Sequence, residues 1–194
     1  RGPGEVDKGR DVLLEHPVRR IGHADGLAHE VEADGPEGHV VFPASHVISS
    51  MPLPHLLLAM DPAVPDDVRR AADGIGYRDF LTVALVVPAV DGFEDNWIYI
   101  HSPEVRVGRV QNFGQWSPHL VKEGRTCLGL EYFVNEGDDL WSSTDEDLVE
   151  RGKTEMERLG LLDPARVEVG YVVRMPKAYP MYDAHYQANV QVLR

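Results

Sequence analysis

The chain has 194 residues, 43% of them hydrophobic, which is enough for one globular domain or for a domain with part of another. Its formal net charge of -13 disfavours nucleic acid and anionic membrane surfaces as partners. The single cysteine, Cys127, excludes an internal disulfide, and no apolar run approaches the roughly 20 residues of a membrane span, so we expect a cytoplasmic protein.

Short segments dominate the first fifty residues. Residues 4–15 are predicted to form a helix, which Gly9 weakens. Residues 17–21, 26–33, 39–42 and 46–49 alternate like strands, and the Asp- and Gly-rich segment 34–38 is typical of a turn. This order predicts a tight β-meander.

Two helices are expected next. Residues 53–60 form an apolar segment that favours a helix. Residues 65–73 begin with Pro65 and two acidic residues, which suit the first turn and the positive end of the helix dipole, and Gly74 ends the pattern.

The second half of the chain is rich in strands. Strands are predicted over residues 80–87, 97–100, 105–113, 125–134 and 167–175. A helix is predicted over 145–159, with Thr144 as its N-cap, and a last helix over 183–193. Because several strands follow one another directly, the fold class is predicted to be α+β, with a largely antiparallel sheet flanked by helices.

Common catalytic and metal-binding motifs are absent from the sequence. The nine histidines show no metal-binding spacing, so no metal site is expected. No GxSxG, Walker loop or GxGxxG occurs, so hydrolase and kinase chemistry have no support, and the catalytic residues stay unknown.

Five residues stand out as candidate ligand contacts. Arg109 lies in an otherwise apolar strand, where a guanidinium needs either an ion pair or an anionic ligand. Trp116 and the closely spaced Tyr179, Tyr182 and Tyr186 could pack internally or form a wall with polar tips that suits a sugar or a phosphate. Both interpretations stay open for each residue.

Several segments, in their order along the chain, resemble a known family. Residues 17–21 (PVRRI) and 44–52 (ASHVISSMP) resemble the middle of flavin amine oxidases and protoporphyrinogen oxidase-like proteins. Residues 107–113 (VGRVQNF), 116–118 (WSP), 130–132 (LEY) and 178–183 (AYPMYD) are similar to the UDP-galactopyranose mutase branch of that superfamily. The resemblance covers nearly all of the chain.

The resemblance implies a division of the chain and a set of roles. Residues 1–52 would be a partial FAD-binding domain and residues 53–194 the substrate-binding domain. Val18 would flank the adenine side of FAD, and Ser50, Met51 and Pro52 would lie near the crossing between domains. Arg109 and Tyr179 would face a nucleotide-sugar diphosphate or a similar anionic small molecule, and Trp116, Tyr182 and Tyr186 are further candidate substrate contacts.

The sequence also departs from the family pattern. The GxGxxG that seats the FAD pyrophosphate and the glycine-rich segment that closes over the flavin are both missing from these 194 residues. We therefore expect an internal fragment that neither holds FAD nor turns over alone. Such a fragment would expose a surface able to pair two copies.

Two alternatives stay open. The first is a flavin oxidase that acts on an amine or an apolar ring substrate, which predicts that Arg109 pairs with an internal acid and that the cleft is apolar, without groups that reach a phosphate. The second is a non-catalytic module that binds a partner through its sheet, which predicts that no bare apolar face is left exposed.

Overall fold

The computed structural model describes residues 11–193, which form two compact units. Of the described residues, the first unit holds 11–75 and 182–193, and the second unit holds Gly76–Met181. The chain thus leaves the first unit once and returns to it near its end. The division predicted at residue 52 stays a prediction.

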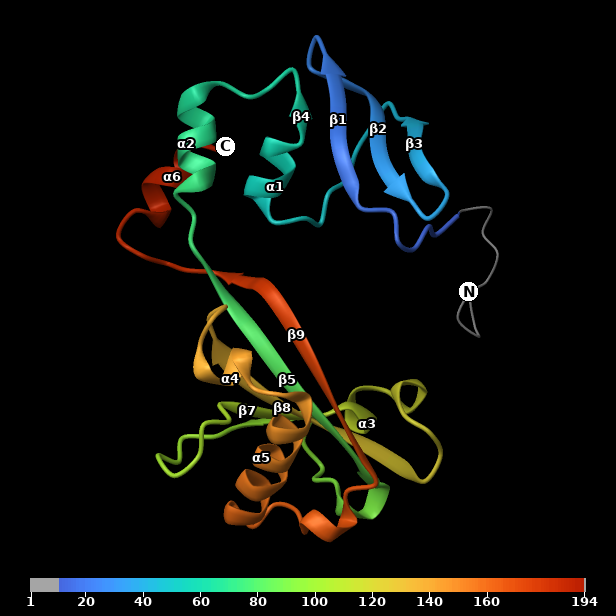
Figure 1. Cartoon of the computed structure of the whole chain (residues 1–194), viewed down its shortest axis with the longest axis vertical. Helices are drawn as coiled ribbons and strands as arrows, with labels where there is room; N and C mark the ends of the chain where they lie inside the picture. The colour runs from blue at the N-terminus through green and yellow to red at the C-terminus, as the bar shows by residue number, and fades with distance from the viewer. Residues whose placement is uncertain (1–10, 194) are drawn as a thin grey trace. The chain divides into compact units, whose positions relative to one another are not determined.

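The first unit contains a four-stranded sheet in the order β3-β2-β1-β4. Its strands are β1 (Val18–Ala24), β2 (Leu27–Gly35), β3 (Gly38–Pro43) and β4 (Met60–Asp61), drawn in blue to cyan in Figure 1. The first three form the predicted antiparallel meander, and β4 pairs with β1 in parallel. Asp25 and Gly26, both with positive φ, make the tight turn between β1 and β2.

Three helices complete the first unit: α1 (Leu53–Leu58), α2 (Asp66–Asp73) and α6 (Tyr186–Val192). Helix α2 ends at Gly74 as predicted, and the side-chain amide of Asn189 on α6 donates to the Gly74 carbonyl at 3.0 Å. Helix α6 begins later than predicted, and the Asp183 carboxylate accepts a hydrogen bond from the Tyr186 N–H at 2.8 Å.

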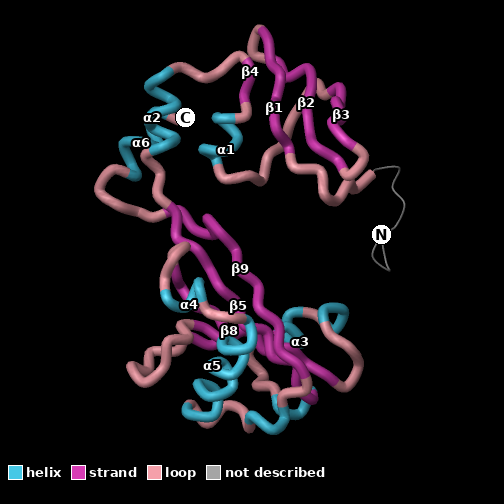
Figure 2. Tube along the Cα trace, viewed as in Figure 1, coloured by secondary structure: helices cyan, strands magenta, loops and turns pink. Residues whose placement is uncertain are grey.

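The second unit is built on a five-stranded sheet in the order β6-β7-β8-β5-β9, in which all neighbouring strands are antiparallel. Figure 2 shows its long strands in magenta. The strands are β5 (Tyr77–Pro88), β6 (Trp97–Tyr99), β7 (Arg109–Asn112), β8 (Arg125–Val134) and β9 (Val169–Pro180). The α+β class with largely antiparallel sheets is therefore confirmed.

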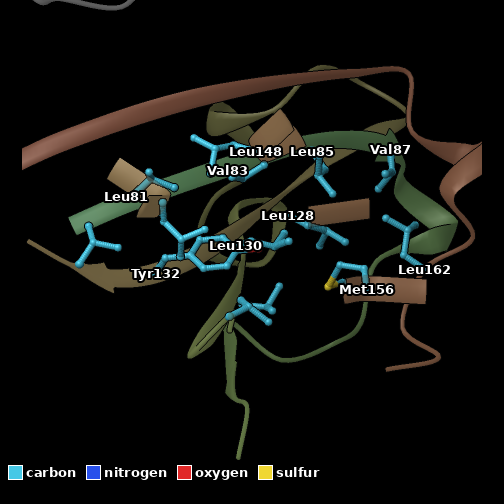
Figure 3. Close-up of a cluster of buried hydrophobic side chains, with 14 residues drawn as sticks. Leu81, Val83, Leu85, Val87, Leu128, Leu130, Tyr132, Leu148, Met156 and Leu162 are labelled. Atoms are coloured by element: carbon cyan, nitrogen blue, oxygen red, sulfur yellow. The ribbon is translucent and has the colours of Figure 1, made fainter. Parts of the chain in front are cut away.

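Helix α5 (Asp145–Arg158) covers one face of this sheet. Thr144 caps it as predicted, since its hydroxyl accepts a hydrogen bond from the Asp147 N–H at 3.1 Å. Alternate residues of β5 are buried because they point toward this helix. Figure 3 shows the resulting apolar core, which includes Leu81, Val83, Leu85, Val87, Leu148 and Met156.

Short helices lie in the connections of the second unit. They are α3 (Phe113–Trp116), α4 (Asp139–Ser142) and the 3-10 turns η1 (Ala89–Asp91), η2 (Pro118–Leu120) and η3 (Pro164–Arg166). Among residues 11–193 no helix is both long enough and apolar enough to cross a membrane.

Three other predicted elements differ from the structure. Residues 46–49 form no strand, and Ile48 is fully exposed with no neighbouring strand. The helix predicted over 4–15 lies largely outside the described residues, and residues 11–15 are not helical. The strand predicted over 105–113 begins only at Arg109, because the Val107 N–H donates to the Glu155 carboxylate instead of to a strand.

Candidate functional site on the open face of the sheet

The face of the five-stranded sheet opposite α5, here called the open face, carries the candidate site. Cross-strand register brings Tyr99, Arg109, Glu131 and Thr82 into one row across β6, β7, β8 and β5. The large side chains that this face leaves exposed include Trp97, Tyr99, Phe133, Tyr171, Val173 and Met175. Such a concentration of exposed apolar groups marks a surface that another group covers.

An ion pair lies at the centre of the open face. Arg109 donates through Nε to the carboxylate of Glu131, and the side-chain amide of Gln111 donates to the other carboxylate oxygen. The Glu131 side chain is only 2% exposed and that of Arg109 is 19% exposed. A carboxylate this buried is costly unless it is paired, and Arg109 and Gln111 supply the two partners. The register of β7 with β8 places both of them beside Glu131.

Two tyrosines surround the guanidinium of Arg109. Its Cζ atom lies 5.8 Å from the ring centroid of Tyr99, within the range of a cation–π contact. The Glu131 carboxylate raises the pKa of Arg109 above its ordinary value, and the hydroxyls of Tyr179 and Tyr99 act in the same direction. Arg109 therefore stays charged while its charge is balanced within the protein.

Aromatic contacts connect Tyr179 to the centre of the sheet. Its ring lies edge-on to Phe80 at 5.9 Å between centroids, and Phe80 lies edge-on to Phe133 at 5.6 Å. The bulge in β9 before this point, where Lys177 has a positive φ, shifts the register between the pairs Arg78–Tyr179 and Phe80–Met175. The open face thus ends in an apolar ring cluster.

Helix α3 lies against the other end of the open face. Asn112 caps it by accepting a hydrogen bond from the Gly114 N–H at 3.2 Å. The Phe113 ring comes so close to Gly129 that a Cβ there would meet Phe113 Cε2 at 2.7 Å. Trp116 then donates from Nε1 to the Gln111 amide oxygen at 3.0 Å. A hydrogen-bonded path therefore runs from Trp116 through Gln111 and Glu131 to Arg109.

The structure brings together three of the five predicted substrate contacts. Arg109, Trp116 and Tyr179 lie on the open face of the second unit. Tyr182 and Tyr186 belong to the first unit, where their rings pack edge-on at 4.6 Å between centroids. The assignment of all five to a substrate stays a prediction.

Four residues of this site were missed by sequence reasoning: Trp97, Tyr99, Gln111 and Glu131. A signal was present for Glu131, because it is an acid within the apolar strand of residues 125–134, just as Arg109 is a base within another. The other three follow only from the register of β6 and β7.

The four predicted cofactor residues all lie in the first unit. Val18 begins β1, while Ser50, Met51 and Pro52 lie in the segment before α1, where the Met51 N–H donates to the Ser49 hydroxyl. They offer backbone groups and one hydroxyl, without a charged side chain or a glycine-rich turn. No buried side-chain polar atom among the described residues lacks a hydrogen-bond partner. By themselves, these residues do not fit the FAD pyrophosphate.

A metal centre has no support in the described part of the chain. Nowhere in residues 11–193 do three or more His, Cys, Asp or Glu side chains gather so that they could hold an ion. The open face itself presents aromatic rings around the charge-balanced Arg109–Glu131 pair.

The fold is that of an α+β protein, in which an antiparallel sheet has one face covered by a helix and one aromatic face open, and in which a β-meander belongs to a separate unit. The model of the flavin containing amine oxidoreductase family matches residues 4–184. The chain belongs to this family, whose cofactor is FAD. The superfamily expected from sequence is thus confirmed, and no curated protein matches the chain.

Solved structures share the fold. Reduced UDP-galactopyranose mutase matches with a TM-score of 0.67 and 19% identity, over 92% of this chain and 37% of that chain. A protein described as a protoporphyrinogen oxidase from Exiguobacterium sp. 255-15 matches with a TM-score of 0.58, 16% identity, and 92% and 38% coverage. A putrescine oxidase variant matches with a TM-score of 0.53 and 20% identity, over 81% of this chain and 33% of that chain. The chain spans between 33% and 38% of the length of these neighbours.

Proposed function

We propose that this chain supplies the substrate-side sheet of a FAD-dependent oxidoreductase and that its open face binds an amine or an apolar ring substrate. The pairing of Arg109 with the buried carboxylate of Glu131 carries this proposal. This pairing supports the oxidase alternative, because it is one of the two features expected for it.

The charge balance supports a substrate without phosphate. A diphosphate is bound most strongly by a guanidinium that is free to form two parallel hydrogen bonds. Arg109 already donates through Nε to Glu131, and its charge is neutralised at short range. The groups around the pair are rings, namely Tyr99, Phe133 and Tyr179, which suit an apolar or cationic ligand.

One observation favours a second candidate, an anionic substrate such as a nucleotide sugar. Register places Arg78 opposite Tyr179 at the end of β5, and the Arg78 side chain is exposed. Among the described residues, no carboxylate lies within ion-pair distance of it. Arg78 could therefore offer a phosphate a positive charge that no carboxylate of the described residues already balances, unlike that of Arg109.

FAD is the cofactor of the family. When bound, it accepts a hydride or offers a reactive flavin nitrogen. In the proposal, Val18, Ser50, Met51 and Pro52 line only one edge of its site, and other parts of the protein hold the pyrophosphate. Purifying the chain with excess FAD tests this division. A colourless product is expected, and stoichiometric yellow protein would contradict it.

The substrate class is tested by calorimetric titration of the chain with benzylamine and with UDP-galactose. We expect benzylamine to bind and UDP-galactose to show no heat beyond dilution. Binding of UDP-galactose that disappears in Arg78→Ala would support the second candidate instead. Loss of that binding in Arg109→Met, with Arg78→Ala unaffected, would overturn the argument from the Arg109–Glu131 pair.

A further inference from the structure

Two tryptophans form a stacked pair on the open face. Trp97 comes from β6 and Trp116 from the end of α3, and their ring centroids lie 5.1 Å apart with an interplanar angle of 15°. Trp97 is 42% exposed and Trp116 is 46% exposed. Two of the three tryptophans of the chain therefore present ring surface to solvent at one place.

The pair is held in position before any ligand arrives. Trp116 is oriented by its hydrogen bond to Gln111, and Gln111 is oriented by Glu131. Trp97 is the direct cross-strand neighbour of Gln111. Since both indoles are fixed against the same glutamine, binding a flat ligand would cost little ordering of side chains.

Internal packing does not account for this exposure. Trp141, the third tryptophan, is half-buried and packs against the core of the second unit. Trp97 and Trp116 instead stack on each other and keep large areas in water, although indoles are normally well buried. The only polar atom of the Trp116 ring is already bonded, so what remains available is π surface.

We propose that the Trp97–Trp116 pair is a binding platform for a planar aromatic ring that carries no negative charge. Glu94 and Asp95, both exposed, lie three and two residues before Trp97, and the chain has a net charge of -13, so an anionic ring is disfavoured. This inference rests on the proposed function, because the platform would hold the ring of a substrate bound at the same open face.

Nuclear magnetic resonance provides the test, because the three indole N–H groups of the chain give separate signals. Benzylamine is the probe, with cyclohexylmethylamine as the saturated ring of the same charge and benzoate as the same ring of opposite charge. We expect benzylamine to shift the Trp97 and Trp116 signals and to leave Trp141 in place. Cyclohexylmethylamine and benzoate should bind several-fold more weakly.

Variants locate the effect. Trp97→Leu and Trp116→Leu keep apolar bulk but remove the indole, and each should weaken benzylamine binding about three- to tenfold, the effect of losing one aromatic contact. Trp141→Phe is the matched control and should retain the affinity. Folding of each leucine variant is checked on the Trp141 indole signal, which should keep its native shift, and the wild-type comparison of the three probes tests the proposal independently of the variants.

Any of three results would overturn the proposal of a platform. The Trp97 and Trp116 signals could stay unmoved at saturating benzylamine, cyclohexylmethylamine could bind as tightly as benzylamine, or Trp141→Phe could lose as much affinity as the two leucine variants. Heat from benzylamine in calorimetry without shifts at Trp97 and Trp116 would place the ligand elsewhere. That result would reject the platform while the proposed function stands. Binding of UDP-galactose in place of benzylamine would reject the proposed function as well.

Discussion

Glu155 on α5 accepts a hydrogen bond from the backbone N–H of Val107 at 2.9 Å, two residues before β7 begins. The same carboxylate oxygen accepts the hydroxyl of Tyr132 at 3.2 Å, and the Glu155 side chain is 6% exposed. Burial and the neighbouring carboxylate raise the pKa of Tyr132 above its ordinary value. Glu155 thus joins the covering helix to strand β8 and to the segment that leads into β7, in the unit that carries the open face.

Replacing Glu155 should destabilise the second unit. Glu155→Ala leaves the Val107 N–H and the Tyr132 hydroxyl without a partner and opens a cavity, so we expect a loss of about 3 kcal/mol in the free energy of unfolding. Glu155→Gln keeps an acceptor oxygen and should cost about 1 kcal/mol. Urea denaturation followed by circular dichroism measures both, and equal losses would show that the loss of the carboxylate charge, which both variants share, determines the effect, not the cavity or the lost acceptor.

The same contact explains what the sequence could and could not predict. Strand β8 and helix α5 were predicted almost to the residue, because their signals are local: an apolar run of period two, and a threonine cap followed by acids. The late start of β7 was not predictable. It depends on a hydrogen bond from Val107 to a residue 48 positions away.

The candidate site was predictable only in part, for a similar reason. Arg109 stood out in the sequence as a charged residue in an apolar strand, and either an acidic side chain or an anionic ligand could have balanced its charge. Only the register of β7 with β8 identifies Glu131 as the partner. The close spacing of the three tyrosines suggested a single binding surface. In the structure, Tyr179 belongs to the second unit and the pair Tyr182–Tyr186 to the first. Spacing along a chain does not reveal where it changes units.

Removing the charge of Glu131 should change the ligand preference of the open face. Glu131→Gln leaves the Arg109 guanidinium without its counter-ion, so we expect pyrophosphate to bind at least about tenfold more tightly than to the wild type. Isothermal titration calorimetry at low salt measures the change, after circular dichroism has shown that the variant is folded. The double variant Arg109→Met with Glu131→Gln should lose the gain.

The matched control for Glu131 is Glu168, which pairs with the exposed Arg125 at 2.7 Å. Glu168→Gln also removes one negative charge from the second unit but frees an arginine far less buried, and pyrophosphate affinity should change less than twofold. A similar gain in both variants would mean that net charge, and not the release of Arg109, governs anion binding.

Filling the contact beneath Phe113 should disturb helix α3. A methyl group at Gly129 would lie 2.7 Å from Phe113 Cε2, so Gly129→Ala is expected to cost about 1–3 kcal/mol and to displace Trp116 from Trp97. The double variant Phe113→Ala with Gly129→Ala should be less destabilised than the sum of the single changes, because the clash is then gone. Additive losses in denaturation would place the cost of the Gly129 change in the backbone of β8 instead.

The sheet of the first unit should weaken in acid. Arg20 pairs with Glu30, Glu32 and Asp61, and its hydrogen bond lowers the pKa of Glu32 in the folded chain. A lowered pKa contributes stability above the ordinary pKa of the carboxyl, and this stability is lost as the pH falls through the folded pKa. Amide hydrogen exchange along β1 and β2 should therefore speed up in acid beyond its intrinsic change with pH. Arg20→Met should remove most of that added sensitivity, and an unchanged acid response in the variant would assign the effect to other carboxylates.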